Sequence, residues 1–152
     1  MKVEEKESLI KPSSVLLNLT GSSFGECLNE FTSVVQTDKA VLKPEILFRE
    51  VQEREQSSST NTGRGVAFPH ARTDAVKSLF VAVGRSMDGV KFEAASAPVH
   101  LFFLIGTPPE EIGSYLSCMS RLASRLRIPK VMESLMEAQT PEAFLAILQG
   151  ES

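Results

Sequence analysis

The sequence predicts an α/β fold: a single domain in which a mixed β-sheet is flanked by helices on both faces. Two observations support this prediction. Apolar residues recur at helical spacing in the first and last thirds of the chain, whereas the middle third holds short runs rich in Val, Phe and Leu that are typical of strands. With 152 residues, 42% of them hydrophobic, the chain is long enough to bury one sizeable core. We therefore expect one folded domain over residues 13–150, preceded by a loose, charged arm over residues 1–12.

The composition limits the classes of partner. The net charge is -3 and the basic residues form no run, so neither a nucleic-acid surface nor a polybasic membrane patch is predicted. No stretch approaches the length of about 18 apolar residues that spans a bilayer, and the charged first residues lack the apolar core of a signal peptide. Cys27 and Cys118 fall on apolar faces of predicted helices, as buried reduced thiols do. We expect a cytoplasmic protein with protein or small-molecule partners.

The first third of the chain predicts one strand and two helices. The run VLLNL (residues 15–19) is short and apolar, as a strand is. After a turn, Ser23 and Glu26 stand at the spacing of a capping box, which begins a helix. The apolar positions of this helix form one stripe: Cys27, Leu28, Phe31, Val34 and Val35. Pro44 opens a second helix that extends to about Gln56, and the polar, glycine-bearing loop SSSTNTGRG follows.

The middle of the chain changes to the spacing of strands. The predicted strands are residues 66–68, 79–84 and 99–105, with the turn residues Asp88-Gly89 and Ala97-Pro98 between them. The last of these strands, VHLFFLI, is apolar on both of its alternating faces. It is therefore expected at the centre of a sheet that is covered on both sides.

The last third of the chain returns to helical spacing. Between residues 110 and 127 the apolar positions lie on one helical face: Ile112, Tyr115, Leu116, Met119, Leu122, Ala123 and Leu126. Pro129 can begin a further helix, Thr140 caps the last one, and Gly150 follows its end. These helices complete the expected α/β layers.

One histidine stands out in the stretch GVAFPHAR, residues 65–72. The chain has two histidines, and His70 directly follows a proline at the end of a predicted strand. A neutral imidazole nitrogen is nucleophilic near pH 7, and Pro69 stiffens the backbone that presents the ring. His70 is thus a candidate covalent acceptor. The alternative is a histidine that only ends a strand and bonds to backbone.

The residues upstream of His70 favour phosphoryl chemistry. Arg54 provides a planar guanidinium that matches two phosphoryl oxygens, although an arginine in a last helical turn also complements the helix dipole. The loop adds the hydroxyls of Ser59 and Thr60, which are candidates for supporting a phosphoryl pocket. The chain offers no ligand spacing for a metal, no GxSxG, no Walker A loop and no GxGxxG fingerprint. No cofactor is therefore expected, and the remaining chemistry is phosphorylation of an imidazole by a protein donor.

Together these residues resemble a known signature. The stretch EREQSSSTNTGRGVAFPHAR is similar to the signature of the enzyme IIA domains of the bacterial phosphoenolpyruvate-dependent phosphotransferase system (PTS), in the fructose, mannitol and nitrogen-regulatory class. The likeness extends from VLLNL through PVHLFFLIGTP and YLSCMSRLASRL to AQTPEAFLAIL. The resemblance implies a type-2 enzyme IIA domain over residues 13–150, in which His70 accepts a phosphoryl group from a histidine-containing phosphocarrier protein (HPr-like). It also implies that Arg54 helps to neutralise the transferred group.

The sequence departs from the family pattern at two positions. Family members commonly carry a second active-site histidine on the helix after the strand cluster, and Tyr115 stands at the matching position here. A Tyr hydroxyl can donate one hydrogen bond to a phosphoryl oxygen but cannot become cationic; alternatively, Tyr115 only packs on the apolar face of its helix. Asn61 stands where a glycine is usual, and Asn tolerates left-handed backbone better than most residues. His100 begins a buried strand and is interpreted as structural; the alternative, that its side chain faces the site in place of the missing histidine, stays open.

The expected function is that of a phosphohistidine carrier of the PTS, and thus of a phosphotransferase component. The chain is one domain long, without a fused permease segment or a second carrier domain, which favours a free-standing nitrogen-regulatory protein. Two alternatives stay open: a sugar-specific (fructose or mannitol) enzyme IIA component, and a binding module with the same fold and impaired phosphotransfer. The downstream enzyme IIB or regulated target, and the oligomeric state, are not predicted.

Overall fold

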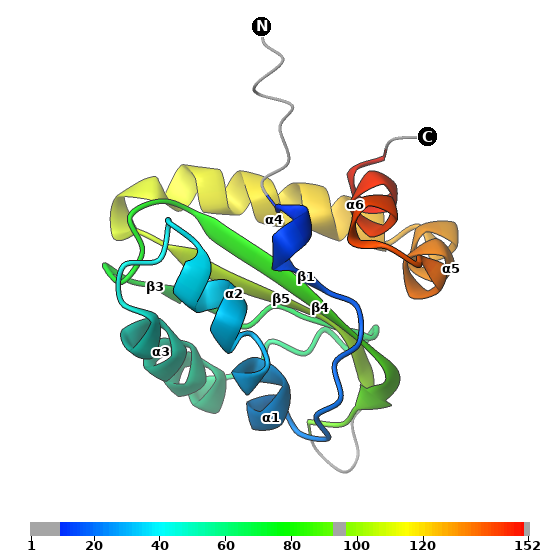
Figure 1. Ribbon diagram of the computed structural model, residues 1–152, viewed down its shortest axis with the longest axis horizontal. Coiled ribbons are helices and arrows are strands. Elements are labelled where there is room, and N and C mark those ends of the chain that lie inside the picture. The colour runs from blue at the N-terminus through cyan, green and yellow to red at the C-terminus, as the bar shows by residue number, and fades with distance from the viewer. Residues whose placement is uncertain (1–9, 93–96, 151–152) are drawn as a thin grey trace, which may run out of the picture.

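The computed structural model describes residues 10–92 and 97–150 of the chain, and Figure 1 shows how their elements are arranged. In chain order the elements are η2 (Pro12–Ser14), β1 (Val15–Leu16), α1 (Phe24–Asn29), α2 (Thr32–Thr37), α3 (Pro44–Ser57), β2 (Val66–Ala67), β3 (His70–Arg72), β4 (Phe80–Val90), β5 (Val99–Thr107), η3 (Pro109–Glu111), α4 (Ile112–Leu126), α5 (Pro129–Glu137) and α6 (Pro141–Gln149). None of the helices in these ranges combines the length and the hydropathy that crossing a membrane requires.

The strands form one mixed sheet, as predicted. Within the described residues the order of its strands is β1-β4-β5-β2, with β3 also paired to β5. β4 and β5 run antiparallel, whereas β1 is parallel to β4, and both β2 and β3 are parallel to β5. β5 thus has neighbours along both edges, which confirms the central position predicted from VHLFFLI.

Helices cover both faces of the sheet, which confirms the predicted layers (Figure 1). Side chains of β5 alternate between two apolar cores. Phe102 and Leu104 pack in the core formed with α1, α2 and α3. Phe103 and Ile105 pack in the core formed with α4, α5 and α6, and all four side chains are at most 1% exposed. Successive residues of a strand point to opposite faces, so the two helical layers explain why the middle of β5, residues 101–105, is apolar on both faces.

The first predicted helix is in fact two short helices, and the prediction of one continuous helix was wrong. Ser23 does cap α1, because its Oγ accepts the Glu26 N–H at 3.1 Å. The helix then breaks between Asn29 and Thr32. There the Thr32 hydroxyl donates to the Asn29 carbonyl at 2.6 Å and competes with the backbone ladder. The apolar spacing does not reveal the break, because residues of both helices still face one core.

The predicted turn at Asp88-Gly89 is also corrected by the structure. These residues lie inside β4, which continues to Val90. Gly89 has a φ of +83°, and the register with β5 shifts between Arg85 and Val90. The pair therefore forms an irregularity within a strand, at which glycine supplies the left-handed backbone that other residues rarely adopt.

The remaining predicted helices are present as α3, α4, α5 and α6. Pro44, Pro129 and Pro141 each stand in a first turn, where a missing N–H costs nothing. The Thr140 hydroxyl caps α6 by accepting the N–H of the third helical residue at 3.0 Å, and Gly150 ends it with a φ of +85°. The cap residues predicted from the sequence are thus confirmed for this helix.

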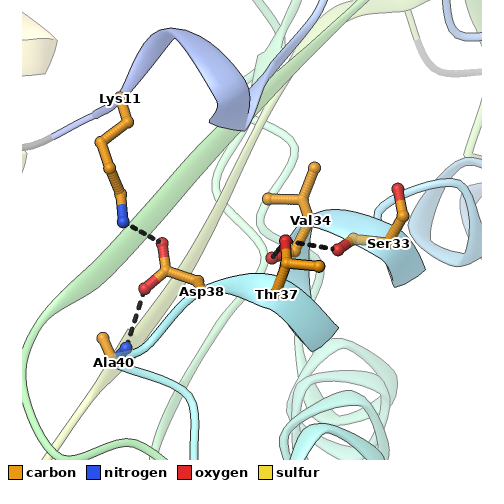
Figure 2. Close-up of polar contacts among 6 residues, drawn as sticks. All are labelled: Lys11, Ser33, Val34, Thr37, Asp38 and Ala40. Atoms are coloured by element: carbon orange, nitrogen blue, oxygen red, sulfur yellow. Dashed lines mark hydrogen bonds and ion pairs between the residues drawn. The ribbon is translucent and has the colours of Figure 1, made fainter.

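The N-terminal segment is packed where it is described. Residues 1–9 of the predicted loose arm lie outside the described residues, whereas Ile10 is only 5% exposed. Lys11 Nζ lies 3.2 Å from Asp38 Oδ2, directly after α2, and Asp38 Oδ1 accepts the Ala40 N–H at 2.8 Å (Figure 2). The described end of the predicted arm therefore contacts the folded domain.

Candidate functional site

His70 is held in place by the central strand of the sheet. It is the first residue of β3 and stands opposite Ile105 of β5. Pro69 has no N–H to pair with a neighbour, so the strand predicted over residues 66–68 ends at Ala67 and β3 begins separately. The Pro69 carbonyl nevertheless accepts the Ile105 N–H at 2.9 Å. The backbone at His70 is thus fixed, while its side chain is partly exposed.

The imidazole of His70 is oriented by a hydrogen bond to backbone. Its Nδ1 lies 2.8 Å from the carbonyl oxygen of Phe68. A carbonyl can only accept, so Nδ1 carries the proton in this arrangement, and in the neutral ring Nε2 carries the lone pair. From the sequence, bonding to backbone was the alternative to a reactive histidine. The structure shows such a bond at Nδ1, and it leaves Nε2 as a nucleophilic nitrogen.

Tyr115 of α4 lies against His70, although the two are far apart in the sequence. Their ring centroids are 5.5 Å apart and the ring planes are tilted by 35°. Burial raises the pKa of Tyr115 from its ordinary value of 10.0, and the nearby charge of Arg54 lowers it by less. The phenol is therefore neutral at pH 7 and keeps its hydroxyl donor. The charge of Arg54 thus acts on Tyr115, which itself lies against His70.

Arg54 lies in the last turn of α3, with its side chain exposed. Its Nη1 donates to the Ser58 carbonyl at 3.0 Å, at the end of its own helix. This contact is the one that the helix-dipole interpretation expects. It uses one of the five N–H donors that any guanidinium has, so the planar fork can still bind an anion. The two interpretations of Arg54 are therefore compatible.

The predicted pocket hydroxyls differ in what they can still donate. The Thr60 N–H donates to Glu55 Oε2 at 2.9 Å, and the Thr60 hydroxyl donates to Glu55 Oε1 at 2.8 Å. Ser59 Oγ accepts the Asn61 N–H at 3.1 Å, which leaves its own hydroxyl proton able to donate. Glu55 was not singled out by the sequence interpretation. Its only signal is its place in EREQ, directly before the serine run.

Asn61 is accommodated without a left-handed backbone. Among the described residues, positive φ values belong to glycines alone, and in this loop they are Gly63 (82°) and Gly65 (87°). Asn61 forms an isolated antiparallel bridge with Ala67, and its side-chain oxygen accepts the Gly63 N–H at 2.9 Å. The left-handed positions of this loop are therefore taken by glycines, and Asn61 is not one of them.

His100 lies away from His70 on the same sheet. Ile105, the partner of His70, stands five residues further along β5 than His100, or about 16 Å at strand spacing. His100 Nδ1 lies 2.9 Å from the Ser86 carbonyl oxygen, and its ring packs beside Gly89. This position supports the structural interpretation of His100. Neither histidine belongs to a group of three or more potential metal ligands within the described ranges.

The chain is similar to proteins of known family. A family model described as "Phosphoenolpyruvate-dependent sugar phosphotransferase system, EIIA 2" matches residues 8–151. The PTS system fructose-specific EIIABC component of Bacillus subtilis is 32% identical over 154 residues, which cover 97% of this chain and 23% of that protein. The nitrogen regulatory protein of Pseudomonas aeruginosa is 29% identical over 143 residues, which cover 93% of each chain. This chain thus spans a minor part of the first relative and nearly all of the second.

The same similarity holds in three dimensions. The crystal structure of nitrogen regulatory protein IIA-Ntr from Neisseria meningitidis matches with a TM-score of 0.83 at 30% sequence identity. The match covers 92% of this chain and 96% of that chain. The agreement therefore extends over nearly the whole fold.

Proposed function

Because the chain belongs to the type-2 enzyme IIA family of the phosphoenolpyruvate-dependent sugar phosphotransferase system, we propose that it carries a phosphoryl group on His70. The donor in this proposal is a histidine-containing phosphocarrier protein. The observation that carries the assignment of His70 is the 2.8 Å hydrogen bond between its Nδ1 and the Phe68 carbonyl. This bond holds the proton on one ring nitrogen and leaves the lone pair on the other. The family resemblance and the enzyme IIA fold that the sequence predicted are confirmed.

The proposed reaction is an exchange between two imidazoles. The lone pair of His70 Nε2 attacks phosphorus, a P–N bond forms there, and the P–N bond of the donor breaks with its electron pair returning to the donor nitrogen. Positive charge develops on the His70 ring, and the Phe68 carbonyl stabilises it through the Nδ1 proton. Since both ends are phosphoramidates, the exchange is close to thermoneutral and depends on positioning. We therefore propose a reversible carrier that needs no metal or nucleotide of its own.

Arg54 and Tyr115 are proposed to bind the transferred group. The Arg54 guanidinium supplies positive charge, and its planar fork suits two phosphoryl oxygens. The Tyr115 hydroxyl is neutral at pH 7, because its ordinary pKa is 10.0 and burial raises it, so it donates a hydrogen bond and adds no charge. Ser59 can donate a further hydrogen bond, whereas Thr60 supports the loop through Glu55.

Exposed apolar side chains next to the site are proposed to contact the donor protein. Ile112 and Leu116 are 37% and 58% exposed, and they stand four residues apart on one face of α4, with Tyr115 between them in the chain. The downstream acceptor, an enzyme IIB or a regulated protein, is left open. We place the carrier in the cytoplasm, because the phosphoryl relay of this system begins with phosphoenolpyruvate, an intracellular metabolite.

Within the family we favour a protein of the nitrogen-regulatory type. The structural match to IIA-Ntr of Neisseria meningitidis, with a TM-score of 0.83, supports this choice. The 32% identity to the fructose-specific component of Bacillus subtilis supports the alternative, a sugar-specific enzyme IIA. Transfer to a fructose-type enzyme IIB separates the two branches, since only the sugar-specific alternative predicts rapid loss of the phosphoryl group to it.

The carrier role is tested by phosphorylation in vitro. The protein is incubated with phosphoenolpyruvate, enzyme I and the histidine phosphocarrier protein, and its intact mass is then measured. We expect a gain of about 80 Da, one phosphoryl group, that is acid-labile and absent from His70→Ala. His100→Gln is the matched control and should be labelled normally. Persistent labelling of His70→Ala would contradict the assignment of His70.

A binding module with impaired transfer is the second candidate, and Tyr115 at the position of the family's second histidine is the observation that favours it. It predicts no labelling of the wild type by a donor that is competent on another acceptor. It also predicts that partner binding is the same for His70→Ala and for the phosphate mimic His70→Asp. A phosphorylation-dependent carrier would bind its partners differently in these two variants.

A further inference from the structure

Glu55 makes a contact to which neither the family resemblance nor the proposed function assigns a role. It lies in the last turn of α3, directly after Arg54, and its side chain is half-buried. Its carboxylate accepts both donors of Thr60, the N–H at 2.9 Å and the hydroxyl at 2.8 Å. A contact at two points fixes the orientation of Thr60 as well as its position.

The contact between Glu55 and Thr60 closes the loop that leads to His70. The Thr60 carbonyl accepts the Phe68 N–H at 3.4 Å, beside the bridge between Asn61 and Ala67. The carbonyl of the same Phe68 holds His70 Nδ1 at 2.8 Å. A continuous series of contacts therefore runs from Glu55 through Thr60 and Phe68 to the imidazole.

The same loop also holds Arg54. Arg54 Nη1 donates to the Ser58 carbonyl at 3.0 Å, and the Ser58 N–H donates back to the Arg54 carbonyl at 3.3 Å. Ser58 stands two residues before Thr60 in the chain, so fixing Thr60 restricts Ser58 as well. The Glu55 carboxylate thus restrains two backbone carbonyls: that of Ser58, which binds Arg54, and that of Phe68, which orients His70.

We propose that Glu55 is a positioning residue for phosphoryl transfer, acting through Thr60 on the Phe68 carbonyl that orients His70 and on the Ser58 carbonyl that anchors Arg54. This inference rests on the proposed carrier function. Transfer between two imidazoles depends on alignment, and a displacement of about 1 Å can slow such a step about a hundredfold. If Glu55 only stabilised the end of α3, its replacement would lower the rate of labelling no more than it lowers the folded fraction.

Matched variants separate positioning from stability. Glu55→Gln keeps the size of the side chain but replaces one acceptor oxygen with a donor, so one Thr60 donor loses its partner. Thr60→Val removes the hydroxyl and keeps the shape, whereas Thr60→Ser keeps the hydroxyl. Glu53→Gln, an exposed position on the same helix, is the control. The initial rate of labelling from the phosphorylated donor and the urea midpoint of unfolding are measured for each variant.

We expect Glu55→Gln and Thr60→Val each to slow labelling about tenfold at a temperature where both are folded. The double variant should be about as slow as the slower single variant, because both changes break one contact. Thr60→Ser should restore most of the rate, and Glu53→Gln should stay within about twofold of the wild type. Equal rates for Glu55→Gln and the wild type, or a loss explained by unfolding alone, would overturn the positioning role.

A second measurement needs no donor protein. The ring ¹⁵N shifts of unphosphorylated His70 report which nitrogen carries the proton. We expect the Nδ1-protonated form to dominate in the wild type and to lose population in Glu55→Gln. If the wild type is labelled while Glu55→Gln changes neither the labelling rate nor the tautomer, the positioning role is wrong and the carrier function stands. If the wild type is not labelled but the tautomer shifts in Glu55→Gln, the carrier function fails and the positioning of His70 is supported.

Discussion

Replacing Tyr115 by histidine would show how charge at this position acts on the phosphoryl group. The ring centroids of Tyr115 and His70 lie 5.5 Å apart, so an imidazole in place of the phenol would lie at a similar distance from a group on His70. Tyr115 is neutral at pH 7, because the ordinary pKa of a phenol is 10.0 and burial raises that of Tyr115 further. Tyr115→His therefore adds, when protonated, a positive charge that the wild type lacks at this position.

The size of the effect follows from Coulomb's law at this separation. At 5.5 Å two opposite unit charges attract by about 3 kcal/mol at an effective dielectric constant of about 20, and by about 0.8 kcal/mol in water. His70 is partly exposed, so we expect about 1 kcal/mol, which accelerates labelling about fivefold. The charge is present below the pKa of the introduced histidine, ordinarily about 6.5, and is lost as the pH rises through it.

The assay is the initial rate of labelling from the phosphorylated donor at about pH 6 and about pH 8, each divided by the wild-type rate at the same pH. Tyr115→His should exceed the wild type at the lower pH and approach it at the higher pH. Tyr115→Phe is the matched control, because it keeps the ring and adds no titrating group. An acceleration that is the same at both pH values, shared by Tyr115→Phe, or absent at both would refute the electrostatic reasoning.

Three further predictions concern other contacts of the fold. Arg85 is 6% exposed and donates to three backbone carbonyls, so Arg85→Met should lower the free energy of unfolding by about 3 kcal/mol in urea titration, and a change near zero would contradict this role. A Cβ at Gly89 (φ +83°) would lie 2.8 Å from another side chain, whereas one at Gly63 (φ +82°) meets nothing within 4 Å. Gly89→Ala should therefore lower the free energy of unfolding by about 2 kcal/mol more than Gly63→Ala does in urea titration. Equal losses of free energy would show that backbone strain alone matters. Because the chain has one Tyr and no Trp, phenolate absorbance reports on Tyr115 alone, with a midpoint above 10.0 that Arg54→Gln raises further; an unchanged midpoint would contradict their proximity.

The layers of the fold could be predicted from residue patterns, and the local breaks in them could not. VHLFFLI is apolar on both of its alternating faces, which requires cover on both faces wherever the strand lies. Asp88-Gly89 favours a turn in an isolated segment, but Val90 pairs with Val99 of β5, so the chain stays in the sheet and forms an irregularity instead. The break before Thr32 depends on a side-chain hydrogen bond that the apolar spacing does not encode.

The candidate site shows the same division. His70 and Arg54 could be proposed from their residue types and from the family pattern. One of only two histidines in the chain directly follows a proline, and this signal is visible in the local sequence. Glu55 could not, because carboxylates are common on helices and only the fold of the following loop brings both donors of Thr60 to this one. The partner of the Thr60 hydroxyl is likewise set by that fold and not by the local sequence.

Local signals were enough to place the caps of α1 and α6, the proline that stiffens the approach to His70 and the alternation that buries both faces of β5. Only the folded chain decided that Nε2 of His70 holds the lone pair, and that the ring of Tyr115, which the family pattern put at the second-histidine position, lies 5.5 Å from the ring of His70. The physical reason is that apolar periodicity specifies which side of an element is buried but not which element covers it. The register of β3 on β5 and the packing of α4 on the sheet set the distances between residues that are remote in sequence, and the chemistry of this site depends on those distances.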